Sequence, residues 1–257
     1  IINRIADFHA DLTATRRDIH AHPELGFQER RTSDMVAKML ESWGIEVHRN
    51  IAGTGLVGVL RNGTSKRSIG FRADMDCLPM TETNDFGHRS TVPGQMHACG
   101  HDGHTTMLLG AAIGLAQSRA FDGKAVLIFQ PAEEGGAGAR AMIEDGLFKR
   151  WPVNEVYGMH NRPNLAVGEF VIAPGPIMGS VDMIDIEIEG VGGHAASPHQ
   201  TIDPVPVAAA LIQAIQTITA RTIDPMDSAV ISVTTIHGGD AFNVISQSLR
   251  LTGTVRT

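Results

Sequence analysis

The sequence contains very little cysteine and no excess of basic residues. Only Cys77 and Cys99 are cysteines among 257 residues, too few for a disulfide framework, which favours a reducing compartment. Lysine and arginine number 21 against 28 acidic residues, and this balance offers no basic stripe to neutralise phosphates. No apolar run approaches the roughly 20 residues that span a bilayer, and no signal-peptide pattern opens the chain. We therefore expect a cytoplasmic protein without a nucleic-acid or membrane partner.

The larger part of the chain alternates between strand-like and helix-like segments. Two helices are expected within residues 1–43, separated by a turn at Pro23 and Gly26, and further helices at 103–118 and 135–147. Alternation of strands with helices predicts an α/β fold in which helices flank both faces of one sheet. The strand-like segments are 45–47, 55–60, 68–74, 125–130, 156–160 and 169–173.

A second pattern begins after the breaker cluster at residues 173–176, Ala-Pro-Gly-Pro. Residues 182–189 alternate between polar and apolar side chains, which predicts a strand with one wet face. A helix at 204–221 and strands at 228–237 and 249–256 complete a β-α-β-β order, the first part of a split βαβ sandwich. We predict two domains, 1–176 and an incomplete α+β ferredoxin-like domain over 177–257. Both ends of the chain look cut, so a longer natural chain is expected.

Chemistry concentrates between His97 and His104, where three histidines and one of the two cysteines lie within eight residues. Imidazole and thiolate are good ligands for zinc and similar divalent ions, and Gly100 and Gly103 let a loop fold tightly around an ion. A single histidine on the surface would not indicate a metal site, but the clustering of three histidines and a cysteine does.

Three predicted strands end in polar residues of the same character. Glu133 and Glu134 follow one strand, His160 follows another, and Asp74 and Asp76 close a third. Taken singly, each has a plain alternative: an acidic helix start, a structural histidine, a turn. Because ligand sites in open α/β sheets lie at the carboxyl ends of strands, we expect convergence on one site. There, one glutamate suits a metal ligand, the other a general base, and Asp74 could orient a ligand histidine.

Five segments of the chain resemble the metallopeptidase-like amidohydrolases, which include hippurate hydrolases, indoleacetyl-amino-acid hydrolases and N-acyl-amino-acid amidohydrolases. They are residues 20–26, 72–76, 97–104, 130–135 and 158–160. The resemblance implies a zinc-peptidase-like catalytic domain holding two divalent ions (zinc, manganese, cobalt or nickel), with Glu133 as general base. It implies four metal ligands within this chain: Cys99, His101, Glu134 and His160. The family's last ligand, a histidine nearer the C-terminus, has no counterpart within the 257 residues.

Residues 192–199 resemble the lid and dimerisation domain of the same family. The resemblance implies that His194 reaches across a homodimer to the scissile carbonyl, and that Asn243 and Arg256 bind the substrate. From its Gly and Pro neighbours alone, His194 fits a turn equally well, and His237 and Cys77 fit structural roles. The predicted reaction is hydrolysis of the amide bond of N-acyl amino acids, releasing a carboxylic acid and a free amino acid. The alternatives are a dipeptidase or aminopeptidase of the same family and an inactive fragment that acts only in binding or dimerisation.

Overall fold

The structure is a computed structural model and describes residues 5–257. It divides into two compact units, one reaching to residue 166 and the other spanning residues 167–257. The two helices predicted near the start are present as α2 (His9–Ala21) and α3 (Arg30–Ser42), while the predicted start at residues 1–4 lies outside the described residues. No helix within residues 5–257 is long and apolar enough to cross a membrane.

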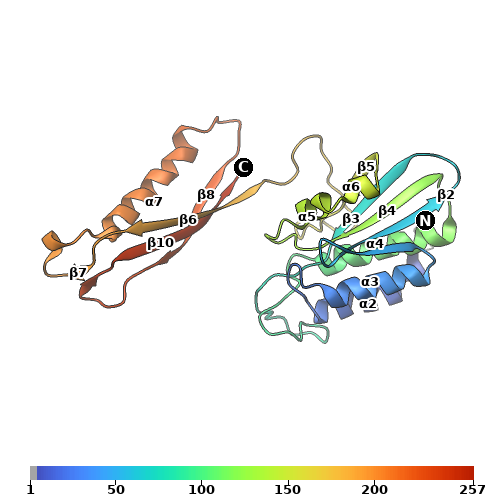
Figure 1. The fold of residues 1–257 in the computed structure, drawn as a ribbon, viewed down its shortest axis with the longest axis horizontal. Helices are drawn as coiled ribbons and strands as arrows, with labels where there is room; N and C mark the ends of the chain where they lie inside the picture. Colours follow the sequence, from blue (N-terminus) through green and yellow to red (C-terminus); the bar gives the residue numbers. More distant parts are fainter. Residues whose placement is uncertain (1–4) are drawn as a thin grey trace. The chain divides into compact units, whose positions relative to one another are not determined.

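The first unit is built on one sheet flanked by helices, as predicted, and this sheet is mixed and has five strands (Figure 1). β3 lies parallel to both β4 and β5, whereas β2 runs antiparallel to β4 and to β1. The carboxyl ends of β3, β4 and β5 therefore meet at one edge of the sheet. In spatial order the strands are β1 (Glu46–Ile51), β2 (Gly55–Asn62), β4 (Gly123–Gln130), β3 (Ser68–Asp74) and β5 (Glu155–Gly158).

Helices cover both faces of this sheet because its central strand is apolar on both sides. In β4, Leu127 and Phe129 join the core beneath α2, α3 and α4 (His101–Ser118), whereas Val126 and Ile128 join the core beneath α5 (Gly138–Glu144) and α6 (Leu147–Arg150) (Figure 1). A strand buried on both faces reads as a continuous apolar run, and β4 does.

Three details differ from the sequence-based expectation. The helix predicted over 135–147 is two short helices, because Gly146 adopts a left-handed φ of +92° between them. β5 ends at Gly158, two residues before His160. The strand predicted over 169–173 is wrong: within residues 5–257 no strand lies beside it, and Ile172 is 86% exposed. A strand needs a backbone ladder to satisfy its peptide groups, and local β propensity cannot replace one.

The second unit has the predicted β-α-β-β order. β6 (Val181–Glu189), β10 (Ser248–Arg256) and β8 (Val230–His237) form an antiparallel sheet in that spatial order. The helix α7 (Pro204–Arg221) is capped by the Asp203 side chain and buries Ala208 in a cluster with Leu249 and Leu251. Two short pieces, β7 (Gly193–His194) and β9 (Val244–Ile245), pair with each other, and a 3-10 turn spans Pro198–Gln200.

Candidate metal centre

The polar residues at three strand ends meet the first turn of α4. Asp74 and Asp76 arrive from β3, the two glutamates from β4 and His160 from β5, and all of them lie beside His101. The helix begins after Gly100, which adopts φ +94°, and a Cβ there would lie 2.4 Å from Oδ1 of Asn161. Glycine is therefore required at this point, both by backbone conformation and by the close approach of the β5 loop.

His101 lies at the centre of the cluster and is fully buried. Its Nδ1 is 3.2 Å from a carboxylate oxygen of Asp76, while its Nε2 lies 3.8 Å from an oxygen of Glu133 and 3.8 Å from an oxygen of Glu134. Nε2 has no hydrogen-bond partner among residues 5–257. Burial lowers the pKa of His101, but the bond to Asp76 and the surrounding acids outweigh it and raise that pKa to about 11. Such a strongly negative environment favours a bound cation.

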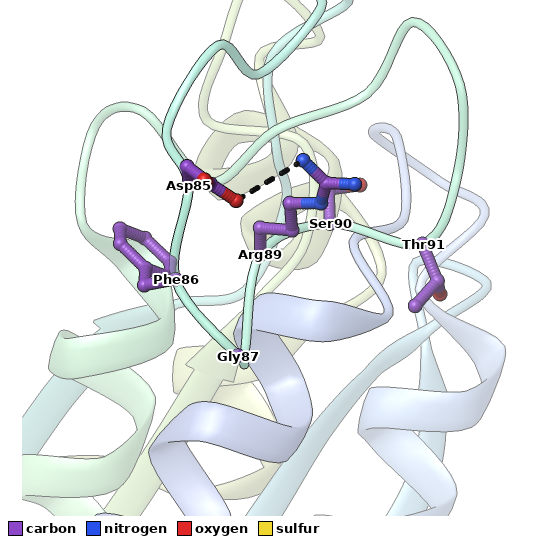
Figure 2. Close-up of a pocket in the computed structure, with 6 residues that line it drawn as sticks. All are labelled: Asp85, Phe86, Gly87, Arg89, Ser90 and Thr91. Atoms are coloured by element: carbon purple, nitrogen blue, oxygen red, sulfur yellow. Dashed lines mark ion pairs between the residues drawn. The ribbon is translucent and has the colours of Figure 1, made fainter.

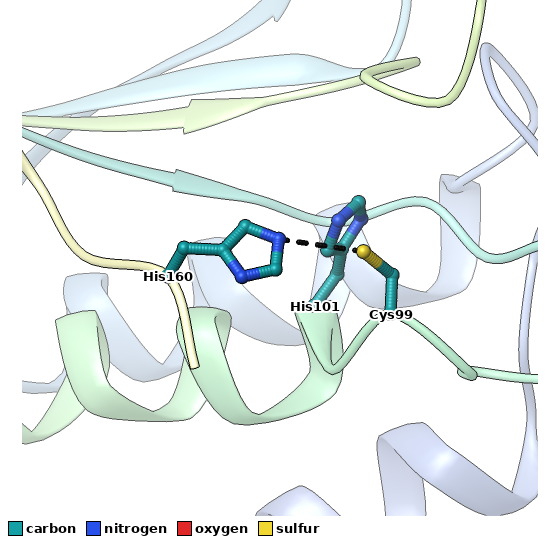
Figure 3. A group of neighbouring side chains, drawn as sticks. All are labelled: Cys99, His101 and His160. Carbon is teal, nitrogen blue, oxygen red and sulfur yellow. Dashed lines mark hydrogen bonds between the residues drawn. The ribbon is translucent and has the colours of Figure 1, made fainter. Parts of the chain in front are cut away.

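Cys99 and His160 form a second group around His101 (Figure 3). Sγ of Cys99 is 3.4 Å from Nε2 of His160, and Nδ1 of His160 donates to the carbonyl of Asn161 at 2.8 Å. Nε2 of a neutral His160 therefore presents its lone pair to the thiol side. The nearby His101 lowers the pKa of Cys99, but burial and the neighbouring Glu134 outweigh it and raise that pKa above its ordinary value. A cation at this point would favour the thiolate, which suits a metal ligand.

The two glutamates differ in their surroundings although both reach His101. Oε1 of Glu134 is buried and has no hydrogen-bond partner within the described chain, and the Glu134 N–H donates to Asp76 at 2.9 Å. The Glu133 side chain is 42% exposed, and burial together with the charge of Glu134 raises its pKa. The geometry thus separates an inward carboxylate suited to a cation from a more open one suited to proton transfer.

Asp74 and Asp76 take roles that the sequence did not separate. Asp74 binds Nδ1 of His104 at 2.6 Å and Nη1 of Arg72 at 2.7 Å; burial raises its pKa, but these partners lower it to about 2. Nδ1 of the central His101 instead donates to Asp76, for which the sequence also allowed the role of a turn residue. The signal was present in the Asp-x-Asp alternation, because residues two apart in extended chain face the same side.

His104 is occupied by hydrogen bonds at both ring nitrogens. Besides Asp74 at Nδ1, its Nε2 accepts the N–H of Asn161 at 3.0 Å. Although Asp74, His101 and His104 also lie close enough together to share an ion, the two other groups fit one better because their ligand atoms are less engaged.

Two further histidines singled out by the sequence lie outside these groups. His97 is buried, which lowers its pKa to about 4. His20, from the N-terminal signature, contacts Asp102 of α4 at 2.8 Å and Glu82 at 3.1 Å. It thereby ties α2 to the segment that leads into Cys99.

The residues predicted to handle substrate all lie in the second unit. His194 in β7 pairs with Val244 of β9, and the carbonyl of Asn243 accepts the N–H of Ala195 at 3.0 Å, so His194 and Asn243 are neighbours. Arg256 pairs with Val181 at the other end of β10. Eight residue steps of a strand separate Ser248 from Arg256, which corresponds to about 27 Å. Within one copy of this unit, Arg256 and Asn243 therefore lie too far apart to hold one carboxylate.

A hollow of about 680 Å³ is lined by none of the residues grouped around His101 (Figure 2). It is lined by the loop 85–91, where Arg89 and Asp85 form an exposed ion pair at 3.7 Å. None of its lining residues has an unpartnered buried polar atom among the described residues. We assign no chemistry to it.

Residues 70–255 match the model of peptidase family M20/M25/M40, and the chain belongs to this family. It is 45% identical over 256 residues to the hippurate hydrolase of Campylobacter jejuni, covering 100% of this chain and 67% of that protein. It is 43% identical over 251 residues to the IAA-amino acid hydrolase ILR1-like 4 of Arabidopsis thaliana, covering 97% of this chain and 56% of the plant protein. The chain thus spans between about half and two thirds of the length of these relatives.

A solved structure supports the same fold and the metal chemistry. The chain superimposes with a TM-score of 0.78 and 38% identity on the Bacillus subtilis protein YXEP, described as a dinuclear metal binding peptidase, over 98% of this chain and 65% of that one. Together with the donor set around His101, this supports a site for divalent metal ions.

Proposed function

We propose that the protein at its natural length hydrolyses the amide bond of N-acyl amino acids, such as hippurate-like or N-acetyl substrates, with two divalent ions. The observation that carries the proposal is the buried, unpartnered Nε2 of His101, with Glu133, Glu134, Cys99 and His160 grouped around this side chain. A buried polar atom without a partner is unfavourable, and a metal ion would satisfy it.

In this proposal Cys99, His101, Glu134 and His160 hold the ions. The donor set of one thiolate, two imidazoles and one carboxylate accepts zinc, manganese, cobalt or nickel. The bound ions supply Lewis-acid polarisation of the substrate carbonyl and favour ionisation of a water molecule. Asp76 fixes the ring of His101 through Nδ1, so that Nε2 points into the site.

Glu133 is the general base in this proposal. Its more open carboxylate and raised pKa suit a group that takes a proton from the attacking water and then passes it to the leaving amine nitrogen. The products are a carboxylic acid and a free amino acid.

We further propose that residues 1–176 form the N-terminal part of the catalytic domain and residues 177–257 a lid that joins two copies in a homodimer. His194 would donate a hydrogen bond to the developing oxyanion of the other copy. Support comes from its Nδ1, which accepts the N–H of Ala196 at 3.0 Å, so that a neutral ring carries its proton on the exposed Nε2. Asn243 and Arg256 would contact the substrate, and in the dimer the two residues can come from different copies of the chain. The two free cysteines are consistent with a cytoplasmic setting.

A second candidate reaction is cleavage of dipeptides, favoured by the likeness to a protein described as a peptidase. The test compares kcat/KM for N-acetyl and N-benzoyl amino acids with that for dipeptides of the same amino acids, using metal-loaded protein. Preference for the acyl substrates supports our proposal, and preference for dipeptides replaces it. Measuring metal content and turnover of the 257-residue chain beside the protein at its natural length decides whether this piece is active or serves only in binding.

A further inference from the structure

The residue immediately before the glutamate pair has an unusual backbone. Ala132 is fully buried and adopts a φ of +49°. This left-handed conformation is unfavourable for alanine and persists only where the surroundings impose it. It also sets the direction in which the chain enters Glu133.

A buried carboxylate from a distant part of the chain holds Ala132 in place. Oε1 of Glu29 accepts the N–H of Ala132 at 2.8 Å, and the other oxygen of Glu29 accepts the Thr54 hydroxyl. Glu29 is fully buried, and burial raises its pKa although both hydrogen bonds lower it. In the next peptide group, the carbonyl of Ala132 accepts the N–H of Gly138 at 3.0 Å.

The segments on either side are fitted closely to Ala132. A Cβ at Gly26 would lie 3.0 Å from the Cβ of Ala132, and one at Gly136 would lie 2.6 Å from it. Gly26 belongs to the N-terminal signature, and Glu29 follows it by three residues. The signature segment therefore packs against the loop that carries the glutamate pair.

Glu133 consequently lies between two anchored peptide groups. The N–H of Ala132 is held by Glu29, and the N–H of Glu134 is held by Asp76 at 2.9 Å. We propose that Glu29 is a positioning residue, which fixes the Glu133 and Glu134 carboxylates at their distances from His101 by holding Ala132 in its left-handed conformation. This inference rests on the proposed function for the roles of the two glutamates, but its geometry does not depend on the substrate.

The test uses three variants of the protein at its natural length. Glu29→Met removes the acceptor and keeps the volume; Glu29→Gln keeps an acceptor for Ala132 and can donate to Thr54; Thr54→Val removes the other partner of Glu29 without touching Ala132. For each we would measure zinc affinity by chelator competition, kcat and KM on an N-acyl amino acid, and the melting temperature.

We expect Glu29→Met to lower zinc affinity and kcat by about 10- to 100-fold, the range typical of residues behind metal ligands, with little change in KM. Glu29→Gln should restore most of both, and Thr54→Val should lower the melting temperature while zinc affinity and kcat stay near wild type. If Glu29→Met does not fold, Glu29→Asp, one methylene shorter, is expected to give the same loss of affinity and kcat.

The proposal is overturned if zinc affinity and kcat survive the loss of the acceptor, or if Thr54→Val reduces them as much as Glu29→Met does, since Glu29 would then act only through general stability. If the wild-type protein binds zinc but hydrolyses no N-acyl amino acid, the proposed function fails. The zinc affinities of the variants would still support or overturn the role of Glu29.

Discussion

The division of labour between Glu133 and Glu134 gives the sharpest prediction. Replacing Glu133 by Gln removes a proton acceptor from a side chain that is 42% exposed, so little packing is lost. Replacing Glu134 by Gln changes a carboxylate that is half as exposed, 22%, and whose inner oxygen has no hydrogen-bond partner within residues 5–257. The first change should therefore affect proton transfer, and the second should affect metal binding.

A positioned general base contributes about 10²- to 10⁴-fold to the rate, which corresponds to about 3–5 kcal/mol in the activation barrier. We expect Glu133→Gln to lower kcat by that amount while metal content stays near wild type. Glu134→Gln should lower metal content at a fixed chelator concentration, and added metal should restore part of its activity. The assays are initial rates on an N-acyl amino acid and elemental analysis of the dialysed protein.

The reverse pattern would refute this assignment. If Glu133→Gln loses metal and Glu134→Gln keeps it, the two roles are exchanged. If both variants keep full metal content and full kcat, the cluster at His101 is not the reaction centre. The exposed Glu155, at the opposite end of β5 from the site, gives a matched control, and Glu155→Gln should change neither quantity.

Three further outcomes follow from burial and pKa. Asp74→Asn should lower the free energy of unfolding by about 2 kcal/mol at pH 7. The pKa of Asp74 is depressed from 3.8 to about 2, so its contribution to stability is present above pH 3.8 and is lost as the pH falls towards 2. The difference in the free energy of unfolding between the two proteins should therefore shrink over this pH range in an acid titration. A difference that stays constant would contradict the prediction. In metal-free folded protein at pH 8, iodoacetamide should modify Cys99 but not Cys77, because Cys77 is 3% exposed and burial raises its pKa to about 12. Peptide mapping identifies the labelled cysteine, and equal labelling of both would contradict the burial of Cys77 in the core. Phe129→Ala should cost about 3–5 kcal/mol in denaturant unfolding, against little for Phe86→Ala, because Phe129 is fully buried and Phe86 is 37% exposed.

The sequence was sufficient for those parts of the fold that depend on periodicity and on breakers. The apolar run of β4, the alternation of β6 and the Asp203-capped helix α7 each carry a local signal, and each element is present. The segment 169–173 failed because its residues favour a strand locally, while strand formation depends on a neighbour that no local signal reports. The break at Gly146 was visible as a glycine, but a single glycine inside a helical pattern does not by itself specify a C-terminus.

The sequence allowed us to predict which strand ends meet at the site, but not which side chains contact one another there. Parallel strands bring their carboxyl ends together, and this alone unites Asp74, Glu133 and His160. Which aspartate contacts which histidine depends on a rotation of about 100° per residue along α4, which places His101 over Asp76 and His104 over Asp74. Hydrogen bonds of this kind depend on side-chain packing, and an error of one helical position would turn both histidines away from their aspartates.

Glu29 shows where sequence reasoning had no local signal at all. In the chain it directly precedes α3, a place where an acidic residue is ordinarily explained by the helix dipole. Its actual partner is 103 residues away, a backbone N–H in a loop whose left-handed alanine no propensity predicts. Gly26 of the N-terminal signature and the nearby Glu29 both contact Ala132, so in this proposal they help to position the two carboxylates that follow β4. The same reasoning predicts that Gly26→Ala, which adds one methyl group 3.0 Å from the Cβ of Ala132, should weaken metal binding. Gly26 itself is not a proposed metal ligand and does not follow any of the three strands that carry the site. The control is Gly44→Ala, because Gly44 adopts a φ of +73° but an added Cβ there would meet nothing within 4 Å. Measuring the metal affinity of both variants by chelator competition would separate displacement of the loop from general destabilisation.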